Sequence, residues 1–268
     1  MSEATRPRWA LILGASSGFG AATCRALAAD GFNLFGVHLD RRSTMPMVQE
    51  VIDDCENLGS KVQFFNINAA DETKRSEVIA QMQETLADDG GTVVVLFHSL
   101  AFGTLVRYVP MPGEEGPTVS AKQMSMTQDV MANSLVYWTQ GVVERGMMER
   151  GGRIFAMTST GGSQVSPSYG VVSAAKAALE AHCRQLAYEL LPHGITANSI
   201  CAGVTDTPAL KKIPGADKLK AKSLDKSPID RLTYPEDVGG AVAALVDERL
   251  HWMTGNVLGI HGGEPFIG

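Results

Sequence analysis

Three residues within one short stretch of the chain could carry out acid–base chemistry together. Ser159 follows an apolar run at residues 153–157, and Tyr169 stands where an alanine-rich helical pattern begins. Lys176 lies seven residues after Tyr169. Because this is close to two helical turns, the phenol and the ammonium return to one face. A nearby positive charge favours phenolate and lowers the pKa of a tyrosine, and the Ser159 hydroxyl could hold a substrate oxygen against that phenol.

The same residues also allow a structural interpretation. Tyr169 could pack at the start of a helix, Lys176 could be a solvated surface lysine, and Ser159 could simply belong to a turn. The elements that surround this stretch must decide between the two interpretations.

A glycine-rich turn near the start of the chain is a second candidate site. An apolar run of strand length, residues 9–13, leads into Gly14-x-x-x-Gly18-x-Gly20, and an amphipathic helix follows to about residue 29. Glycines let the backbone approach a pyrophosphate, and a helix N-terminus offers free N–H groups and a positive dipole. The spacing is not the commoner Gly-x-Gly-x-x-Gly, and a plain glycine-capped turn is the alternative. The predicted phosphate-binding residues are Gly14, Ser16, Ser17, Gly18, Phe19 and Gly20.

The next predicted strand, residues 33–39, bears on the choice of dinucleotide. An acidic residue at the end of this strand usually binds the ribose hydroxyls of NAD, whereas arginine accommodates the phosphate of NADP. Counting from Gly31 places the strand end at His38, so Asp40 lies beyond it, and Arg41 and Arg42 follow. Two planar guanidinium groups suit a phosphate, so the sequence favours NADP(H), with NAD(H) as the alternative and a solvated turn as the structural interpretation.

Strand and helix patterns alternate along the whole chain. Further helices are expected near residues 47–58, 71–87, 128–150 and 235–246, and further strands at 62–66, 93–97, 153–157, 196–200 and 257–260. This alternation predicts an α/β fold: one Rossmann-type doubly wound parallel sheet of about seven strands, with helices on both faces. Residues 1–268 show no internal repeat or linker, which indicates a single domain.

Polar and glycine residues follow several of these strands, at the edge where open parallel sheets bind ligands. They are Asn66, the run His98-Ser99-Leu100-Ala101, and Gly203, Val204 and Thr207, all of which could instead be ordinary turn residues. Residues 102–127 form an irregular stretch, Asn133 falls inside a helical pattern, and the lysine-rich residues 207–227 are expected to form a mobile cover or a solvated surface.

Composition excludes several classes of protein. The chain has 268 residues, is 44% hydrophobic and carries a net charge of −6 without a basic stripe, which argues against nucleic-acid binding. The four cysteines and six histidines lack metal-ligand spacing. No apolar run reaches membrane-spanning length, and the charged opening MSEATRPRWALIL lacks the features of a signal peptide. We therefore expect a cytoplasmic protein without metal or membrane.

Taken together, the motifs resemble those of the short-chain dehydrogenase/reductase family over nearly the whole chain. The resemblance rests on the glycine turn, Asn133, Ser159, Tyr169 with Lys176, and Ala202-Gly203-x-x-x-Thr207. It implies a catalytic set of Asn133, Ser159, Tyr169 and Lys176.

At three places the sequence departs from ordinary members of the family and resembles the divergent branch that contains enoyl-ACP reductases. Ordinary members have Tyr-x-x-x-Lys, whereas position 173 here is Ser and the lysine is Lys176. The ordinary Asn-Asn-Ala-Gly is replaced by the run from His98 to Ala101, and Pro-Gly by Ala202-Gly203. Many enoyl reductases of this branch also carry a second tyrosine ten residues before the first, and here that position is Ser159.

The resemblance implies how a dinucleotide would bind. Its pyrophosphate would lie on residues 14–20 and its adenine near Asn66 and Ile67. The segment with Gly203, Val204 and Thr207 could reach the nicotinamide carboxamide, and Ser99, Leu100 and Ala101 are further predicted cofactor contacts. Lys176 would hold the nicotinamide ribose and keep Tyr169 acidic, while hydride reaches the β-carbon of an α,β-unsaturated thioester. The substrate would be an acyl thioester or a carbonyl compound, carried by acyl carrier protein or coenzyme A, and the resemblance implies a homotetramer.

Two other functions remain open. A ketone/alcohol oxidoreductase would use Ser159, Tyr169 and Lys176 as a carbonyl-reducing triad; Ser159 favours it and the wide Tyr–Lys spacing opposes it. A cofactor-binding sensor without turnover is the second alternative, although such a protein has no need of both Tyr169 and Lys176.

Overall fold

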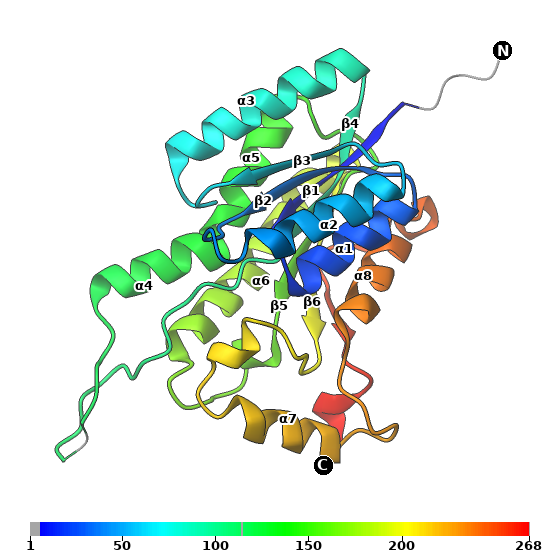
Figure 1. Cartoon of the computed structure of the whole chain (residues 1–268). Coiled ribbons are helices and arrows are strands. Elements are labelled where there is room, and N and C mark those ends of the chain that lie inside the picture. The colour runs from blue at the N-terminus through cyan, green and yellow to red at the C-terminus, as the bar shows by residue number, and fades with distance from the viewer. Residues whose placement is uncertain (1–5, 114, 268) are drawn as a thin grey trace.

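Seven parallel strands form one sheet in the order β3-β2-β1-β4-β5-β6-β7 (Figure 1). The computed structural model describes residues 6–113 and 115–267, so the first five residues of the charged opening lie outside the described part. The strands are β1 Arg8–Leu13, β2 Asn33–His38, β3 Val62–Asn66, β4 Thr92–His98, β5 Arg153–Thr158, β6 Thr196–Ala202 and β7 Val257–Ile260. The predicted doubly wound α/β sheet of about seven strands is confirmed.

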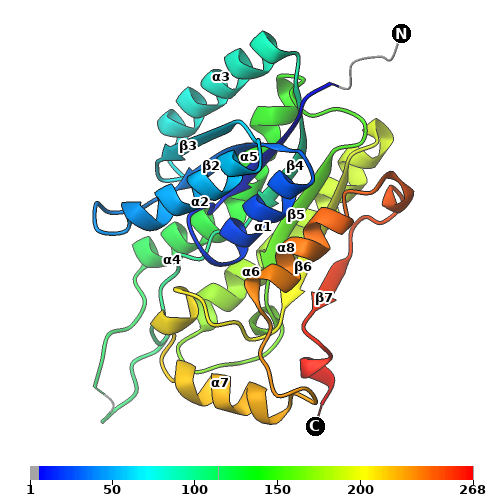
Figure 2. The same ribbon diagram turned by 45° about the vertical axis from the view of Figure 1, so that its right-hand side comes forward.

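The strands separate two hydrophobic cores, one on each face of the sheet. Trp9, Leu11 and Leu13 of β1 belong to one core, and Ala10 and Ile12 belong to the other, because successive strand residues point to opposite faces. Helices α3, α5 and α6 cover the first face and α1, α2 and α8 the second, as Figure 2 shows. Their bounds are α1 Gly18–Ala29, α2 Met45–Asn57, α3 Glu72–Asp89, α5 Ser134–Glu144, α6 Gly170–Leu190 and α8 Pro235–Ala244.

The order of the strands reverses between β1 and β4. Leu13 pairs with Val37 of β2 on one side and with His98 of β4 on the other. The connections from these two strands leave on opposite faces, which opens a crevice outside their carboxyl ends. The fold therefore brings the glycine turn after β1 and the polar run after β4 to one place.

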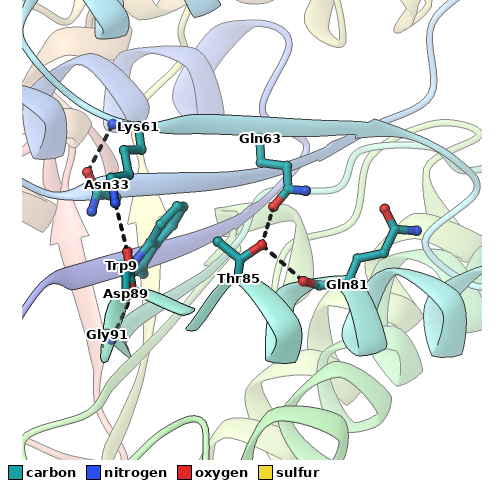
Figure 3. Close-up of polar contacts among 8 residues, drawn as sticks. All are labelled: Trp9, Asn33, Lys61, Gln63, Gln81, Thr85, Asp89 and Gly91. Atoms are coloured by element: carbon teal, nitrogen blue, oxygen red, sulfur yellow. Dashed lines mark hydrogen bonds and ion pairs between the residues drawn. The ribbon is translucent and has the colours of Figure 1, made fainter. Parts of the chain in front are cut away.

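Polar contacts fix the C-terminal half of α3 beneath the sheet (Figure 3). The Asp89 carboxylate accepts hydrogen bonds from Trp9 Nε1 at 3.1 Å and from the backbone N–H of Gly91 at 2.8 Å. Thr85 Oγ1 donates to Gln63 Oε1 of β3 at 3.1 Å. These contacts tie the helix to β1 and β3, away from the crevice.

The stretch between β4 and β5 differs from its prediction. The expected irregular segment contains a helix, α4 Ala121–Gln128, which begins with a capping box formed by Ser120 and Gln123. The expected helix over 128–150 starts as a π-helical turn, Asp129–Asn133, and continues as α5 only to Glu144. A Ser-x-x-Gln pattern is a helix-start signal, so α4 could have been predicted from the sequence.

The lysine-rich stretch after β6 also contains regular structure. A 3₁₀ turn, Leu210–Lys212, precedes α7 Ala216–Asp225. Figures 1 and 2 place α7 beyond the carboxyl end of β6, and the segment before α4 extends away from the sheet in both views. None of the helices built from the described residues is both long and apolar enough to cross a membrane.

Candidate active site

The glycine turn after β1 is shaped so closely that side chains are excluded from it. Gly14 has φ +93°, and a Cβ added there would lie 2.6 Å from the carbonyl oxygen of Ser99. A Cβ at Gly20 would collide with the carbonyl oxygen of Gly14, so α1 packs directly on the turn. The N-cap residue Ser17 is extended and its side chain makes no cap hydrogen bond. The first N–H groups of α1 therefore remain available to an anion such as a pyrophosphate.

The loop after β6 closes over this turn. A Cβ at Gly18 would lie 3.3 Å from Cγ2 of Thr207, so two segments that the sequence assigned to one cofactor are brought together. Thr207 also accepts a hydrogen bond at Oγ1 from the N–H of Leu210 at 3.2 Å, which fixes the start of the following 3₁₀ turn.

Glu264, near the C-terminus, supports the same loop. Its Oε2 accepts a hydrogen bond from the N–H of Val204 at 2.9 Å, and a Cβ at Gly203 would lie 2.9 Å from that oxygen. Val204, predicted as a cofactor contact, thus gives its N–H to Glu264 in this structure. The 60 residues that separate Glu264 from Val204 explain why sequence patterns missed it.

Asp40 lies beside the glycine turn. His38 Nδ1 lies 3.0 Å from Asp40 Oδ2. Burial would raise the pKa of the Asp40 carboxyl, but hydrogen bonds with Ser16, Thr44 and His38 hold it below its usual value. Asn66, predicted near the adenine, binds the backbone of Asp40. Its Oδ1 accepts a hydrogen bond from the Asp40 N–H and its Nδ2 donates one to the Asp40 carbonyl, each at 3.0 Å.

The other predicted cofactor residues fall at the same edge with different exposure. Ser99 donates its N–H to the carbonyl of Leu13 at 2.8 Å, and Ile67 donates its N–H to the carbonyl of His38 at 2.8 Å. Arg41, Arg42 and Ala101 are exposed, while Phe19 and Leu100 are partly buried against the two cores.

The candidate catalytic hydroxyls face one another. Ser159 Oγ and Tyr169 Oη are 3.4 Å apart, between the end of β5 and the start of α6. Gly161 lies beneath the phenol ring, because a Cβ there would collide with Cε1 of Tyr169 and lie 3.2 Å from Ser159 Oγ. Ser168, just before the tyrosine, has φ +61°, a left-handed conformation that is uncommon outside glycine and often found at functional sites.

Lys176 is buried on the same helix, with only 5% of its surface exposed. Its Nζ donates to the backbone carbonyl of Met157 at 2.6 Å. Burial lowers the pKa of Lys176 to about 8, against the opposing effect of the Glu180 carboxylate. Burial also raises the pKa of Tyr169, which the hydrogen bond with Ser159 only partly offsets. The expectation that Lys176 lowers the Tyr169 pKa is therefore wrong for the chain on its own, since the ammonium points to Met157.

His98 joins the buried side of this cluster. Its Nε2 lies 2.8 Å from Oγ of Ser134, which in turn donates to the carbonyl of Val130 at 2.8 Å. Burial, reinforced by the positive charge of Lys176, lowers the pKa of His98 to about 3, so the ring is neutral at physiological pH. This contact joins the end of β4 to α5, at the point where the π-helical turn ends.

Asn133 lies in the π-helical turn, but its side chain is engaged elsewhere. Its Nδ2 donates to Oδ1 of Asp129 at 2.9 Å, and its Oδ1 lies 3.3 Å from Nε2 of His182. These contacts do not join it to Tyr169 or Ser159, so its catalytic role stays a prediction. Among the described residues, no group of three or more His, Cys, Asp or Glu side chains is arranged to hold a metal ion.

Comparisons with known proteins agree with this geometry. A family model described as enoyl-(acyl carrier protein) reductase matches residues 14–264. The chain is 27% identical to a 3-oxoacyl-[acyl-carrier-protein] reductase of Thermotoga maritima, over 94% of this chain and 96% of that protein. It is 29% identical to an NADH-dependent enoyl-[acyl-carrier-protein] reductase of Aquifex aeolicus, over 72% and 69%.

Among solved structures, a 3-oxoacyl-[acyl-carrier protein] reductase from Brucella melitensis, crystallised with NAD, superimposes with a TM-score of 0.82. It is 24% identical and the match covers 99% of this chain and 100% of that one, which supports the fold. The chain belongs to the short-chain dehydrogenase/reductase family and is an NAD(P)-dependent oxidoreductase of the Rossmann-type fold.

Proposed function

We propose that the protein reduces the carbon–carbon double bond of an enoyl thioester. The observation that carries this proposal is the placement of Tyr169 and Lys176 seven residues apart at the start of α6, with the lysine buried and the phenol at the carboxyl edge of the sheet. This spacing separates the enoyl-reducing branch from ordinary family members. The family model that matches most of the chain bears the same activity in its description.

The residues present fit a dinucleotide at the crevice. The backbone of the glycine turn is packed too closely for side chains at Gly14 and Gly20, and no side chain caps the N-terminus of α1. A reduced nicotinamide held there would supply a hydride to the β-carbon of the substrate, and the enolate so formed would take a proton at its α-carbon from solvent. Lys176, freed from the Met157 carbonyl, would hold the nicotinamide ribose.

Tyr169 would stabilise the oxygen of the thioester carbonyl as negative charge develops on it. Its raised pKa keeps the phenol protonated at neutral pH, which suits a hydrogen-bond donor. Ser159, 3.4 Å away, would orient that hydroxyl. A preorganised donor of this kind contributes on the order of 3–4 kcal/mol to lowering the barrier.

For the cofactor we propose NAD(H). Arg41 and Arg42 favour NADP(H) in the sequence, but both are exposed. The Asp40 carboxylate is tied to Ser16 of the glycine turn and to His38. A carboxylate in this position can accept hydrogen bonds from ribose hydroxyls and repels a 2′-phosphate.

The acyl part of the substrate would enter beside the segment that precedes α4. A Cβ at Gly170, the residue after Tyr169, would lie 2.8 Å from the Tyr108 ring, so this ring rests on the start of α6. Phe102, Val109 and Met111 of the same segment are exposed apolar side chains. We propose that this segment provides an apolar path for an acyl chain toward the start of α6.

Residues 207–227 would form the cover over this path, as the sequence suggested. Asp206 lies 3.7 Å from Nζ of Lys220 and 3.9 Å from Nζ of Lys211. These partly exposed ion pairs are weak enough to open. The lysines give the cover a positive surface suited to an acidic acyl carrier protein, and the homotetramer implied by the family resemblance stays a prediction.

The decisive experiment measures oxidation of NADH and NADPH with crotonyl thioesters of coenzyme A and acyl carrier protein, beside a panel of ketones and 3-oxoacyl thioesters. We expect turnover of the enoyl thioesters, and Tyr169→Phe should lower kcat by roughly a hundredfold with cofactor affinity unchanged. Turnover that survives in Tyr169→Phe would remove the phenol from the mechanism.

Reduction of ketones or 3-oxoacyl thioesters is the second candidate, and the 3.4 Å contact between Ser159 and Tyr169 favours it. The two hydroxyls could bind one carbonyl oxygen together. Ser159→Ala separates the candidates: it should cost ketone reduction far more than enoyl reduction, since only the former needs both donors. Cofactor binding without consumption of any substrate would instead indicate a sensor.

The cofactor proposal has its own test. The ratio of kcat/KM with NADH to that with NADPH should exceed one in the natural protein and fall at least tenfold in Asp40→Ser, which removes the negative charge. The double variant Arg41→Ala/Arg42→Ala is the matched control and should leave the NADH parameters unchanged. A natural preference for NADPH that the double variant abolishes would refute the assignment to Asp40.

A further inference from the structure

Glu180 lies on α6, one helical turn after Lys176, in the half-buried space behind the candidate active site. Its Oε1 accepts a hydrogen bond from Oγ1 of Thr158 at 2.6 Å. Thr158 is the last residue of β5 and is buried. Glu180 therefore connects the helix that carries Tyr169 and Lys176 to the end of the strand that leads into Ser159.

This connection is one of three at consecutive residues of the strand end. The Met157 carbonyl accepts Nζ of Lys176 at 2.6 Å, the Thr158 hydroxyl donates to Glu180, and the Ser159 hydroxyl lies 3.4 Å from that of Tyr169. The contacts fix the strand end to α6 at three points. A Lys176 that turns to a ribose, as in the proposed function, would leave Met157, and the part-buried Thr158–Glu180 hydrogen bond would still join the strand end to α6.

The turn after Ser159 closes tightly over the same pair. A Cβ at Gly162 would lie 3.3 Å from Oε1 of Glu180 and 3.3 Å from Cβ of Lys176. Glu180 is thus confined by the strand end below, the turn above and the helix itself. A carboxylate confined in this way has a defined position relative to the lysine.

Glu180 is also the negative charge that acts on the buried ammonium. It raises the pKa of Lys176 against the effect of burial. His98 of β4 faces the lysine as a neutral ring. Near Glu180, burial raises the pKa of Cys183 on α6 and of Cys201 on β6 to about 11 in each case, so both remain neutral thiols.

Two further charged side chains act on these thiols. Arg184 on α6 and Glu264 of the C-terminal segment influence Cys183 and Cys201 respectively. Tyr169 is the remaining titratable group of the candidate active site, and its raised pKa keeps the phenol neutral. Among the described residues, Glu180 is the carboxylate whose charge acts on the pKa of Lys176.

We propose that Glu180 is a positioning residue of the active site: through Thr158 it holds the Ser159 strand end against α6, and it places a carboxylate one helical turn from Lys176. The proposal rests on the proposed function in one respect, that Lys176 acts as a cation toward the cofactor. Glu180 is not part of the catalytic set predicted from the sequence, which consists of Asn133, Ser159, Tyr169 and Lys176.

Glu180→Gln tests the charge, because the amide oxygen can still accept the Thr158 hydroxyl. We expect the alkaline limb of kcat/KM to move to lower pH by about one unit, since a neighbouring opposite charge shifts a pKa by roughly this amount or more. The affinity for NADH, followed by fluorescence across pH 6–10, should show the same shift without any substrate present. Glu189→Gln is the matched control, because Glu189 is exposed on the same helix and contacts Gln185.

Thr158→Val tests the strand-end contact without changing charge. We expect kcat to fall several-fold with a smaller pH shift, and Thr158→Ser, which restores the hydroxyl, to recover most of it. If Glu180→Gln proves too unstable to assay, a Thr158→Val enzyme with unchanged kcat and KM refutes the positioning role by itself.

Two results would overturn the inference. One is a pH profile of Glu180→Gln that coincides with those of the natural protein and Glu189→Gln. The other is a kcat that Thr158→Val leaves unchanged. Absence of turnover with every thioester and ketone would refute the proposed function instead, and the pH dependence of NADH affinity would still decide the role of Glu180.

Discussion

Lys176 carries a cost that can be measured directly as a pH dependence of stability. Its side chain is 5% exposed, and burial lowers its pKa from the ordinary 10.5 to about 8. Each unit of pKa shift corresponds to about 1.4 kcal/mol of differential stabilisation, so the protonated lysine costs the folded chain roughly 3 kcal/mol at neutral pH. Lys176→Met fills the same space without a charge and removes this cost.

The sign of the effect follows from proton counting. Below about pH 8 both the folded and the unfolded chain hold the proton on Lys176, and the cost is present in full. Between about 8 and 10.5 the unfolded chain binds more protons than the folded chain, so the natural protein gains stability as pH rises. Lys176→Met lacks this titration. The natural protein should therefore gain roughly 3 kcal/mol relative to the variant, most of it by pH 10.

Urea denaturation of both proteins at pH 7, 8, 9 and 10, at one protein concentration, measures this difference. The variant also loses the contact with the Met157 carbonyl. Below pH 8 this loss is a constant offset, and its change at higher pH is part of the Lys176 titration itself. Lys218→Met, at an exposed position on α7, is the control for removal of a positive charge. A stability difference between the natural protein and Lys176→Met that stays flat from pH 7 to 10 would refute the reasoning.

Three further predictions follow from individual contacts. Gly161→Ala would push a methyl group into the ring of Tyr169, so kcat should fall by about a hundredfold while NADH affinity, measured by fluorescence, is retained. Tyr108→Ala removes the ring that rests on the start of α6 and should raise KM for enoyl thioesters several-fold in steady-state assays, with little change in kcat. Asp89→Ala leaves Trp9 Nε1 without its acceptor. That variant should lower the free energy of unfolding by about 1–2 kcal/mol in urea, with unchanged KM.

The fold was predictable from the sequence because its signals are local. Apolar runs of strand length alternate with amphipathic helices, and glycines mark the turns between them, so the seven strands were found within a few residues of their observed bounds. The glycine turn could likewise be placed at the ligand-binding edge from its position between β1 and α1. The capping box of Ser120 and Gln123 also predicts the start of α4. The prolines and glycines that precede it favour an irregular segment, and for that reason the helix was not expected.

Much of the site depends on contacts between residues distant in the chain, which local patterns do not report. The direction of Lys176 toward Met157 follows from the end of β5, and the support of Val204 by Glu264 joins segments 60 residues apart. The position of Asp40 against Ser16 depends on where β2 ends relative to the glycine turn. These contacts act on the pKa values of Asp40 and Lys176, and sequence patterns alone do not report them.

The choice between enoyl and ketone reduction depends on the walls around Tyr169 more than on the phenol itself. A protonated phenol stabilises a developing oxyanion equally well when hydride arrives at the carbonyl carbon or two carbons away at the β-position. The two reactions differ in how far from the nicotinamide the substrate's carbonyl oxygen must be held. In this chain Ser159 Oγ lies 3.4 Å from the phenol oxygen, and the Tyr108 ring rests on the start of α6, where we propose the acyl path. A compact ketone would have no use for such a path. An enoyl thioester would use it, because its carbonyl oxygen would contact the phenol while its β-carbon lay farther into the crevice. Comparing kcat and KM of Ser159→Ala and Tyr108→Ala on both substrate classes measures this difference.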